Sequence, residues 1–183
     1  MGPRDRSHTS PPFEGPLRLA FHVATVAGIG RAPAAPGTAG AAFATAVFVL
    51  LSLLPRGAAV VLLGVASAAA FAAGVWAAGR LGAATGREDD GCIVIDEVVG
   101  QWLALAPLLV VPGWRFAWDA PGLAPLVSGF VAFRVFDIWK PGPVGWAERR
   151  FAGGLGVMMD DVVAGALGAV ALAAGLALLG GAR

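Results

Sequence analysis

Five apolar runs separate the charged segments of this 183-residue chain, and they constrain its fold more than any other feature. The runs cover residues 39–54, 58–79, 93–111, 123–139 and 157–180. The second run is long enough to cross a bilayer as a helix, since a span needs about 20 apolar residues. With 57% hydrophobic and 14% charged residues, the chain is far more apolar than an average soluble domain. We therefore predict an all-α integral membrane protein, a helical bundle with about five transmembrane helices.

The N-terminal 40 residues differ from these runs in composition. Residues 1–16 carry four prolines and scattered charges with no periodic apolar pattern, which predicts a mobile tail. Residues 17–30 are apolar but too short to span, and we interpret them as a short interfacial or re-entrant helix. Residues 31–40 (RAPAAPGTAG) are expected to form a loop, because prolines and glycines interrupt helices. Residues 17–183 are predicted to form a single membrane-embedded domain.

Basic residues are distributed unequally between the two sides that these runs would connect. Three of them, Arg56, Arg115 and Arg183, fall on one side. The other ten fall on the opposite side: Arg4, Arg6, Arg18, Arg31, Arg80, Arg87, Arg134, Lys140, Arg149 and Arg150. By the positive-inside rule, the ten residues mark the cytoplasm. The N-terminus is then cytoplasmic and, with five spans, the C-terminus is on the outer side.

Two pairs of adjacent acids lie at the predicted cytoplasmic ends of two runs. Asp96 and Glu97 open the third run, and Asp160 and Asp161 open the last one. An aspartate at the centre of a membrane helix costs roughly 2.5–3.5 kcal/mol to insert, so such acids usually face a bundle interior or a polar cavity. Acids in a first helical turn can also simply complement the helix dipole, worth about 0.3–1 kcal/mol each. A cap needs only one acid, however, so we favour a shared metal site.

The composition also restricts which metal the site could hold. A single cysteine, Cys92, and two histidines exclude a cysteine-built or histidine-rich metal site. Oxygen ligands favour a hard cation such as Mg²⁺. We predict that Mg²⁺ is held by four carboxylates: Asp96, Glu97, Asp160 and Asp161. Asp137 is either a further metal ligand or the base that orients a water molecule.

Basic groups beside these acids predict phosphate binding. Arg134 and Asp137 are three residues apart, on one helix face, and Lys140 follows one turn later. Arg binds phosphate in a bidentate manner and Lys acts as a point charge. The same residues could also anchor the helix at the headgroup level. Gly37 and Thr38, at the start of a helix, offer free backbone N–H groups and a hydroxyl to an anion, although this signal is weak by itself.

Three blocks of the sequence resemble the bacterial phosphatidylglycerophosphatase A family: APGTAG at 35–40, IVIDEVVGQWLAL at 93–105, and FRVFDIWKPGPVGWAERRFAGGLGVMMDDVVAG at 133–165. The resemblance covers nearly all of residues 28–168. It implies a Mg²⁺-dependent lipid phosphatase that hydrolyses phosphatidylglycerophosphate to phosphatidylglycerol and phosphate, a step of phospholipid biosynthesis, at the cytoplasmic face of the inner membrane. The chain departs from the family at Ala41, where serine is common, and in residues 1–16.

Several alternatives stay open at this point. The attacking group is either water or a carboxylate that forms an aspartyl-phosphate. A small ion-coupled transporter or channel subunit would also contain intramembrane acids, but here the acids gather at one face. A lipid headgroup transferase would normally show a DGxxAR-type pattern, which the sequence lacks. Nucleic-acid binding is excluded, because the net charge is only +1 and no basic stripe exists.

Overall fold

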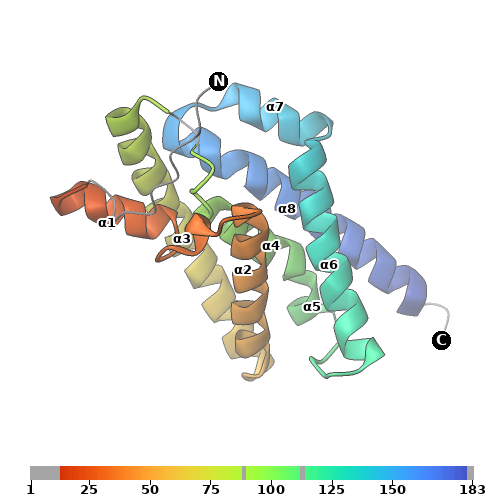
Figure 1. Ribbon diagram of the computed structural model, residues 1–183. Helices are drawn as coiled ribbons and strands as arrows, with labels where there is room; N and C mark the ends of the chain where they lie inside the picture. Colours follow the sequence, from red (N-terminus) through yellow and green to blue (C-terminus); the bar gives the residue numbers. More distant parts are fainter. Residues whose placement is uncertain (1–12, 88–89, 112–113, 181–183) are drawn as a thin grey trace.

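The computed structural model describes residues 13–87, 90–111 and 114–180, and within these ranges every regular element is a helix (Figure 1). The elements are α1 (Gly15–Ala24), a 3-10 turn (Ile29–Arg31), α2 (Pro36–Ser52), α3 (Arg56–Thr85), α4 (Ile95–Leu105), α5 (Pro107–Val110), α6 (Ala120–Trp139), α7 (Gly142–Arg150) and α8 (Gly153–Gly180). The prediction of an all-α fold is therefore confirmed. Residues 1–12 of the predicted tail lie outside the described residues.

Among the described residues, three helices are long and apolar enough to cross a membrane: α3, α6 and residues Gly153–Leu178 of α8. Such helices are typical of an integral membrane protein. The other two predicted spans correspond to shorter elements. The first is α2, with 17 residues, and the second is split into α4 and α5 at Pro107, whose missing N–H interrupts the helix. The count of five spans, and the position of α1 relative to the membrane, stay predictions.

The short helix α4 forms the centre of the bundle, where it contacts α2, α3, α6 and α8 (Figure 1). Most of its residues are buried. A Cβ atom on Gly100 would lie 2.7 Å from the Asp161 carbonyl oxygen of α8, so these two backbones can meet only at a glycine. Trp102 Nε1 donates a hydrogen bond to the Ala44 carbonyl of α2 at 2.9 Å. These contacts hold α4 inside the bundle, together with the acidic pair in its N-terminal turn.

Two helices begin earlier than the sequence indicates. Helix α2 starts at Pro36, so half of the predicted loop at residues 31–40 is helical, with proline in a first-turn position that it favours. Helix α8 starts at Gly153, and the glycine-rich segment before the last apolar run is part of it. A Cβ atom on Gly154 would collide with the Val75 carbonyl of α3, so this glycine permits close helix packing. Asp160 therefore lies about two turns inside α8, and the prediction that the second acidic pair opens a helix is wrong.

Candidate active site

The predicted site residues come from four helices that meet at one end of the bundle. They lie at the starts of α2 and α4, the end of α6 and the first third of α8 (Figure 1). Asp96 and Glu97 occupy the first turn of α4. The residue before this helix, Val94, donates its N–H to the Ala24 carbonyl at 2.9 Å and fixes where the turn begins. Segments far apart in the sequence are thereby brought to one place.

Three carboxylates lie close together at this end of the bundle and form a carboxylate centre. One oxygen from each of Asp96, Glu97 and Asp161 lies within 4.8 Å of the others. Asp161 is only 3% exposed, and its Oδ2 and Glu97 Oε2 are buried without a hydrogen-bond partner among the described residues. Carboxylates buried together repel one another unless a cation compensates them. Carboxylate oxygens are the ligands that a hard divalent ion such as Mg²⁺ prefers, so the chemistry of this all-oxygen group suits such an ion.

Arg134 lies beside the carboxylate group. Its Nη1 is 2.6 Å from Asp137 Oδ2, an ion contact without hydrogen-bond alignment, and its Nε is buried without a partner in the described chain. Gly37 of α2 packs so closely here that an added Cβ would collide with Glu97 Oε1 and lie 3.3 Å from Arg134 Nη1. The first-turn amides of α2 therefore approach the same space as the guanidinium. Helix-start N–H groups and arginine are both suited to bind a phosphate.

Lys140 and Asp160 form a second polar group in the site. Lys140 ends α6 in a left-handed conformation, with φ of 45°. Its Nζ lies 2.8 Å from Asp160 Oδ2 and 2.7 Å from Glu148 Oε1 of α7. Burial lowers the pKa of Lys140, but hydrogen bonds from its ammonium to the two carboxylates outweigh this and raise the pKa above its ordinary value. Lys140 therefore stays charged at neutral pH.

A cavity of about 140 Å³ connects the two polar groups. Polar lining residues come from both groups: Asp96, Lys140, Glu148 and Asp160. The cavity is open to water-sized molecules between the start of α4, the end of α6 and α8. Lys140 of one group and Asp96 of the other therefore line the same cavity.

Of the residues predicted for this site, the structure brings seven side chains and Gly37 to one end of the bundle. Asp96, Glu97 and Asp161 share the carboxylate centre, while Asp160 pairs with Lys140. Thr38 follows Gly37 in α2 and is exposed, so its role in phosphate binding stays a prediction.

Two residues at the site were missed by the sequence reasoning. Glu148 lies on α7, beyond the Pro141 turn, and no helical spacing connects it to Lys140. Gln101 is fully buried, and neither of its amide atoms has a hydrogen-bond partner among the described residues. The sequence does indicate Gln101 as a site residue, because it lies four residues after Glu97, on the same helix face, within an otherwise apolar run.

The fold and the site together define a class: an all-helical protein with helices apolar enough to cross a membrane and a cluster of carboxylates, Arg and Lys at one end. A model of the family "Phosphatidylglycerophosphatase A" matches residues 22–176 of the chain. The chain therefore belongs to the phosphatidylglycerophosphatase A family. It is a lipid phosphatase, a phosphoric monoester hydrolase.

Individual relatives agree with this assignment. The chain is 36% identical over 144 residues to phosphatidylglycerophosphatase A of Escherichia coli, covering 78% of this chain and 74% of the relative. It is 34% identical over 138 residues to the Haemophilus influenzae protein of the same name, covering 75% and 76%. A Bacteroides thetaiotaomicron protein named "Putative phosphatidylinositol-3-phosphatase" is 41% identical over 152 residues, covering 82% and 89%. No solved structure matches the chain.

Proposed function

We propose that this protein hydrolyses the terminal phosphomonoester of phosphatidylglycerophosphate, giving phosphatidylglycerol and inorganic phosphate, with Mg²⁺ as cofactor. The observation that supports this most is the group of three carboxylates within 4.8 Å, beside Arg134. Asp96, Glu97 and Asp161 would hold Mg²⁺, with Asp160 at the edge of the site. The ion would polarise the phosphoryl oxygens and favour attack on phosphorus.

The remaining residues act on the phosphate itself. Arg134 presents a guanidinium whose Nε has no partner in the described chain, and Asp137 holds that guanidinium through its Nη1. Lys140, which lines the cavity between the two polar groups, would add a second positive charge. Together they neutralise charge on the phosphate as it develops in the transition state. Asp137 is also close enough to Arg134 to act near the bound phosphate, as a base or as a ligand.

A strip of apolar side chains on α6 supports a lipid as the substrate. It is formed by Phe130, Val131, Val135, Ile138 and Trp139, and Arg134 borders it. Val131, Val135 and Ile138 are all at least 46% exposed. The strip therefore faces the surroundings of the bundle while its polar edge reaches the phosphate site. A lipid lying along α6 could extend its headgroup inward past Arg134.

The site is proposed to face the cytoplasm from the inner membrane. The support is the excess of basic residues on the side that carries Lys140, Arg149 and Arg150. In a Cys92→Ser background, a single cysteine placed at Gly86 should be labelled from the cytoplasmic side only. Labelling of the same position from the periplasmic side would reverse the proposed orientation.

The decisive experiment measures phosphate release by the purified protein with Mg²⁺ from three lipids. These are phosphatidylglycerophosphate, phosphatidic acid and phosphatidylinositol 3-phosphate, the last because one relative is named for it. We expect the highest kcat/KM for phosphatidylglycerophosphate. A higher value for either of the other lipids would overturn the proposed substrate and leave the lipid phosphatase class intact.

A further inference from the structure

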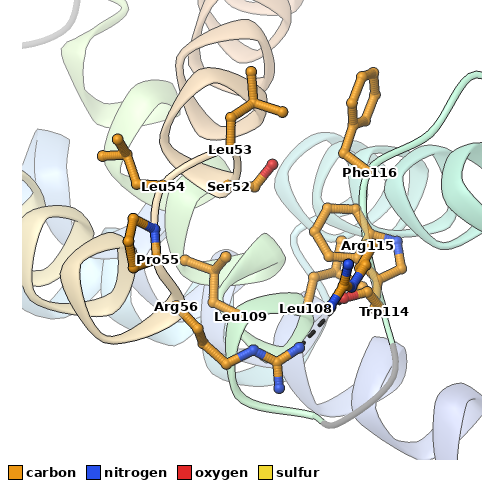
Figure 2. Close-up of a pocket in the computed structure, with 10 residues that line it drawn as sticks. All are labelled: Ser52, Leu53, Leu54, Pro55, Arg56, Leu108, Leu109, Trp114, Arg115 and Phe116. Atoms are coloured by element: carbon orange, nitrogen blue, oxygen red, sulfur yellow. Dashed lines mark hydrogen bonds between the residues drawn. The ribbon is translucent and has the colours of Figure 1, made fainter.

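A second and larger cavity lies at the opposite end of the bundle from the carboxylates. Its volume is about 600 Å³. The turn between α2 and α3 lines one side and the segment before α6 lines the other (Figure 2). The lining residues are Ser52, Leu53, Leu54, Pro55, Arg56, Leu108, Leu109, Trp114, Arg115 and Phe116. None of them belongs to the phosphatase site.

The helix directions place this cavity at the other surface of the membrane. Helix α6 begins near the cavity and ends at the phosphatase site, and α3 begins at Arg56 and runs to the end where α8 starts (Figure 1). Both helices are long and apolar enough to cross a membrane. The two sites are therefore separated by about one membrane thickness.

Two arginines give the cavity a positive charge that the described chain leaves uncompensated. Arg56 Nη2 donates to the Trp114 carbonyl at 3.3 Å, and Figure 2 shows Arg115 beside the same tryptophan. Neither arginine forms an ion pair with a carboxylate among the described residues. Arginine is disfavoured on the outer side of a membrane protein. Two of the three basic residues predicted on that side nevertheless line one cavity, which indicates that they have a role there.

Apart from Ser52, the other side chains that line the cavity are apolar. Leu53 and Leu54 at the end of α2 are 66% and 42% exposed, and Phe116 packs edge-on against Trp118 at 5.2 Å between ring centroids. Tryptophans near a helix end are typical of the headgroup level of a bilayer. The cavity thus combines two guanidinium groups with apolar side chains, at the depth where a phospholipid has both a phosphate and the start of its acyl chains.

We propose that this cavity binds an anionic phospholipid of the leaflet opposite the active site. Arg56 and Arg115 would contact the phosphate and the additional negative group of the headgroup, since arginine pairs strongly with phosphate oxygens. Leu53, Leu54 and Phe116 would contact the acyl chains. The site is separate from the phosphatase chemistry and does not depend on it.

The test is thermal unfolding of the purified protein in detergent, with dioleoylphosphatidylserine or dioleoylphosphatidylcholine added. A ligand that binds only the folded state stabilises it by RT ln(1 + [L]/Kd), so Tm rises with the logarithm of the ligand concentration above Kd. At a lipid concentration about 100-fold above Kd, we expect phosphatidylserine to raise Tm by roughly 5–10 °C. Phosphatidylcholine, which has no net charge, should raise it much less. Equal stabilisation by both lipids would overturn the proposal.

Variants locate the site. Arg56→Gln with Arg115→Gln should lose most of the stabilisation by phosphatidylserine, while Arg149→Gln with Arg150→Gln, which removes two exposed arginines at the other end, should keep it. Arg115→Gln alone makes the same test without breaking the Arg56 hydrogen bond, should the double variant not fold. Retained stabilisation in Arg115→Gln would contradict the proposal.

Two further outcomes would overturn the proposed occupant. If Arg134→Gln with Lys140→Gln abolishes the stabilisation, the lipid binds at the phosphatase site. If inorganic phosphate alone gives the same rise in Tm, the cavity is an anion site that does not recognise a lipid. Turnover by Arg115→Gln should equal that of the unchanged protein, because this residue lies at the far end of the bundle from the reaction.

Discussion

The two acidic pairs look alike in the sequence and occupy different positions in the fold. Asp96 and Glu97 lie in the first turn of α4, whereas Asp160 and Asp161 lie about two turns inside α8. A carboxylate in a first turn is stabilised by the helix dipole, so the first pair has a structural explanation that needs no metal. The second pair has no such explanation, because the dipole effect fades within the first turn. Asp160 is paired with Lys140, whereas Asp161 Oδ2 is buried without a partner among the described residues. Asp161 is therefore the stronger indication of a cation site.

The members of the second pair also differ from each other. Asp161 is buried against the first pair, in the carboxylate centre, whereas Asp160 accepts a hydrogen bond from Lys140. Neighbouring residues on a helix point about 100° apart, which lets one pair serve two groups. The functional group is therefore a cluster of side chains from different helices, and two acids that are adjacent in the sequence need not belong to the same cluster.

Removal of the metal should have the largest effect, because it acts on both pairs at once. Excess EDTA should abolish phosphate release, and added Mg²⁺ should restore it, since carboxylate oxygens favour hard ions. If both pairs bind the same ion, Asp96→Asn and Asp161→Asn should each raise the Mg²⁺ concentration needed for half-maximal turnover. Full turnover in excess chelator would show that the carboxylates do not act through a metal.

Single substitutions in the two pairs should have the next largest effect. Asp161→Asn and Asp96→Asn keep the side-chain size and remove a charge, so we expect turnover per folded protein to fall by more than about 100-fold, the upper end of what second-shell changes cost at metal sites. The control is Asp119→Asn. Asp119 caps α6 through a 2.9 Å bond to the Gly122 N–H, and Asn caps as well as Asp does.

The two pairs have different roles if Asp96→Asn keeps as much turnover as the control, Asp119→Asn. The first pair would then be a helix cap, and the second pair alone would carry the site. Near-normal turnover in both Asn variants would place the active site elsewhere. Helical content from circular dichroism separates loss of activity from loss of fold.

Arg134→Lys is expected to reduce kcat/KM by roughly 10- to 100-fold. Lys retains the charge but loses the bidentate fork, and a hydrogen bond to a charged group is worth about 1.5–3 kcal/mol. Stability should change little, because the charge beside Asp137 is kept. The measurement is the full dependence of the rate on surface concentration of the lipid. Unchanged kcat/KM would remove Arg134 from phosphate binding.

The fold was largely predictable from the sequence, and the reason is the length of the apolar runs. Their hydrophobicity predicted α2, α3, α6 and α8 to within a few residues at most ends. The burial of α4 was not predictable, because it depends on Gly100 meeting the backbone of α8. The start of α8 was misplaced for a similar reason: Gly154 is a packing residue, and the predicted run began only at residue 157.

The site was predictable in its residue types and less so in its pairings. The acids and Arg134 stand out because charge is costly in an apolar run. The contact between Lys140 and Glu148 depends on the left-handed turn that reverses the chain between α6 and α7, and no residue spacing encodes it. Gln101 was overlooked because an amide carries no charge, although it is completely buried.

Gly37→Ala should reduce turnover by about tenfold while the protein still folds. The new methyl group would collide with Glu97 Oε1 and approach Arg134, and small misplacements at a reacting centre cost rate steeply. Alanine is also a better helix former than glycine. Gly64→Ala in α3 is the matched control, since a Cβ there meets nothing within 4 Å. Equal activity of the two variants would show that Gly37 does not border the site.

The smallest effect is expected for Glu148→Gln, and it tests how the second pair is held. Lys140 lies between Asp160, whose side chain is 13% exposed, and Glu148, whose side chain is 50% exposed. A solvent-exposed ion pair is worth about 0.2–1 kcal/mol, so Glu148→Gln should change kcat/KM only two- to fivefold. Asp160→Asn should cost clearly more, because a buried charge partner is weakly screened.

Ionic strength and pH distinguish the role of Glu148 from that of Asp160. The effect of Glu148→Gln should shrink as ionic strength rises, whereas that of Asp160→Asn should persist. The contribution of Lys140 to stability is complete below its ordinary pKa of 10.5 and is lost only as pH rises through its higher folded value. The two variants should therefore keep the same ratio of activities between pH 7 and 9. A larger loss in Glu148→Gln than in Asp160→Asn would mean that α7, and not α8, positions Lys140 for the phosphate.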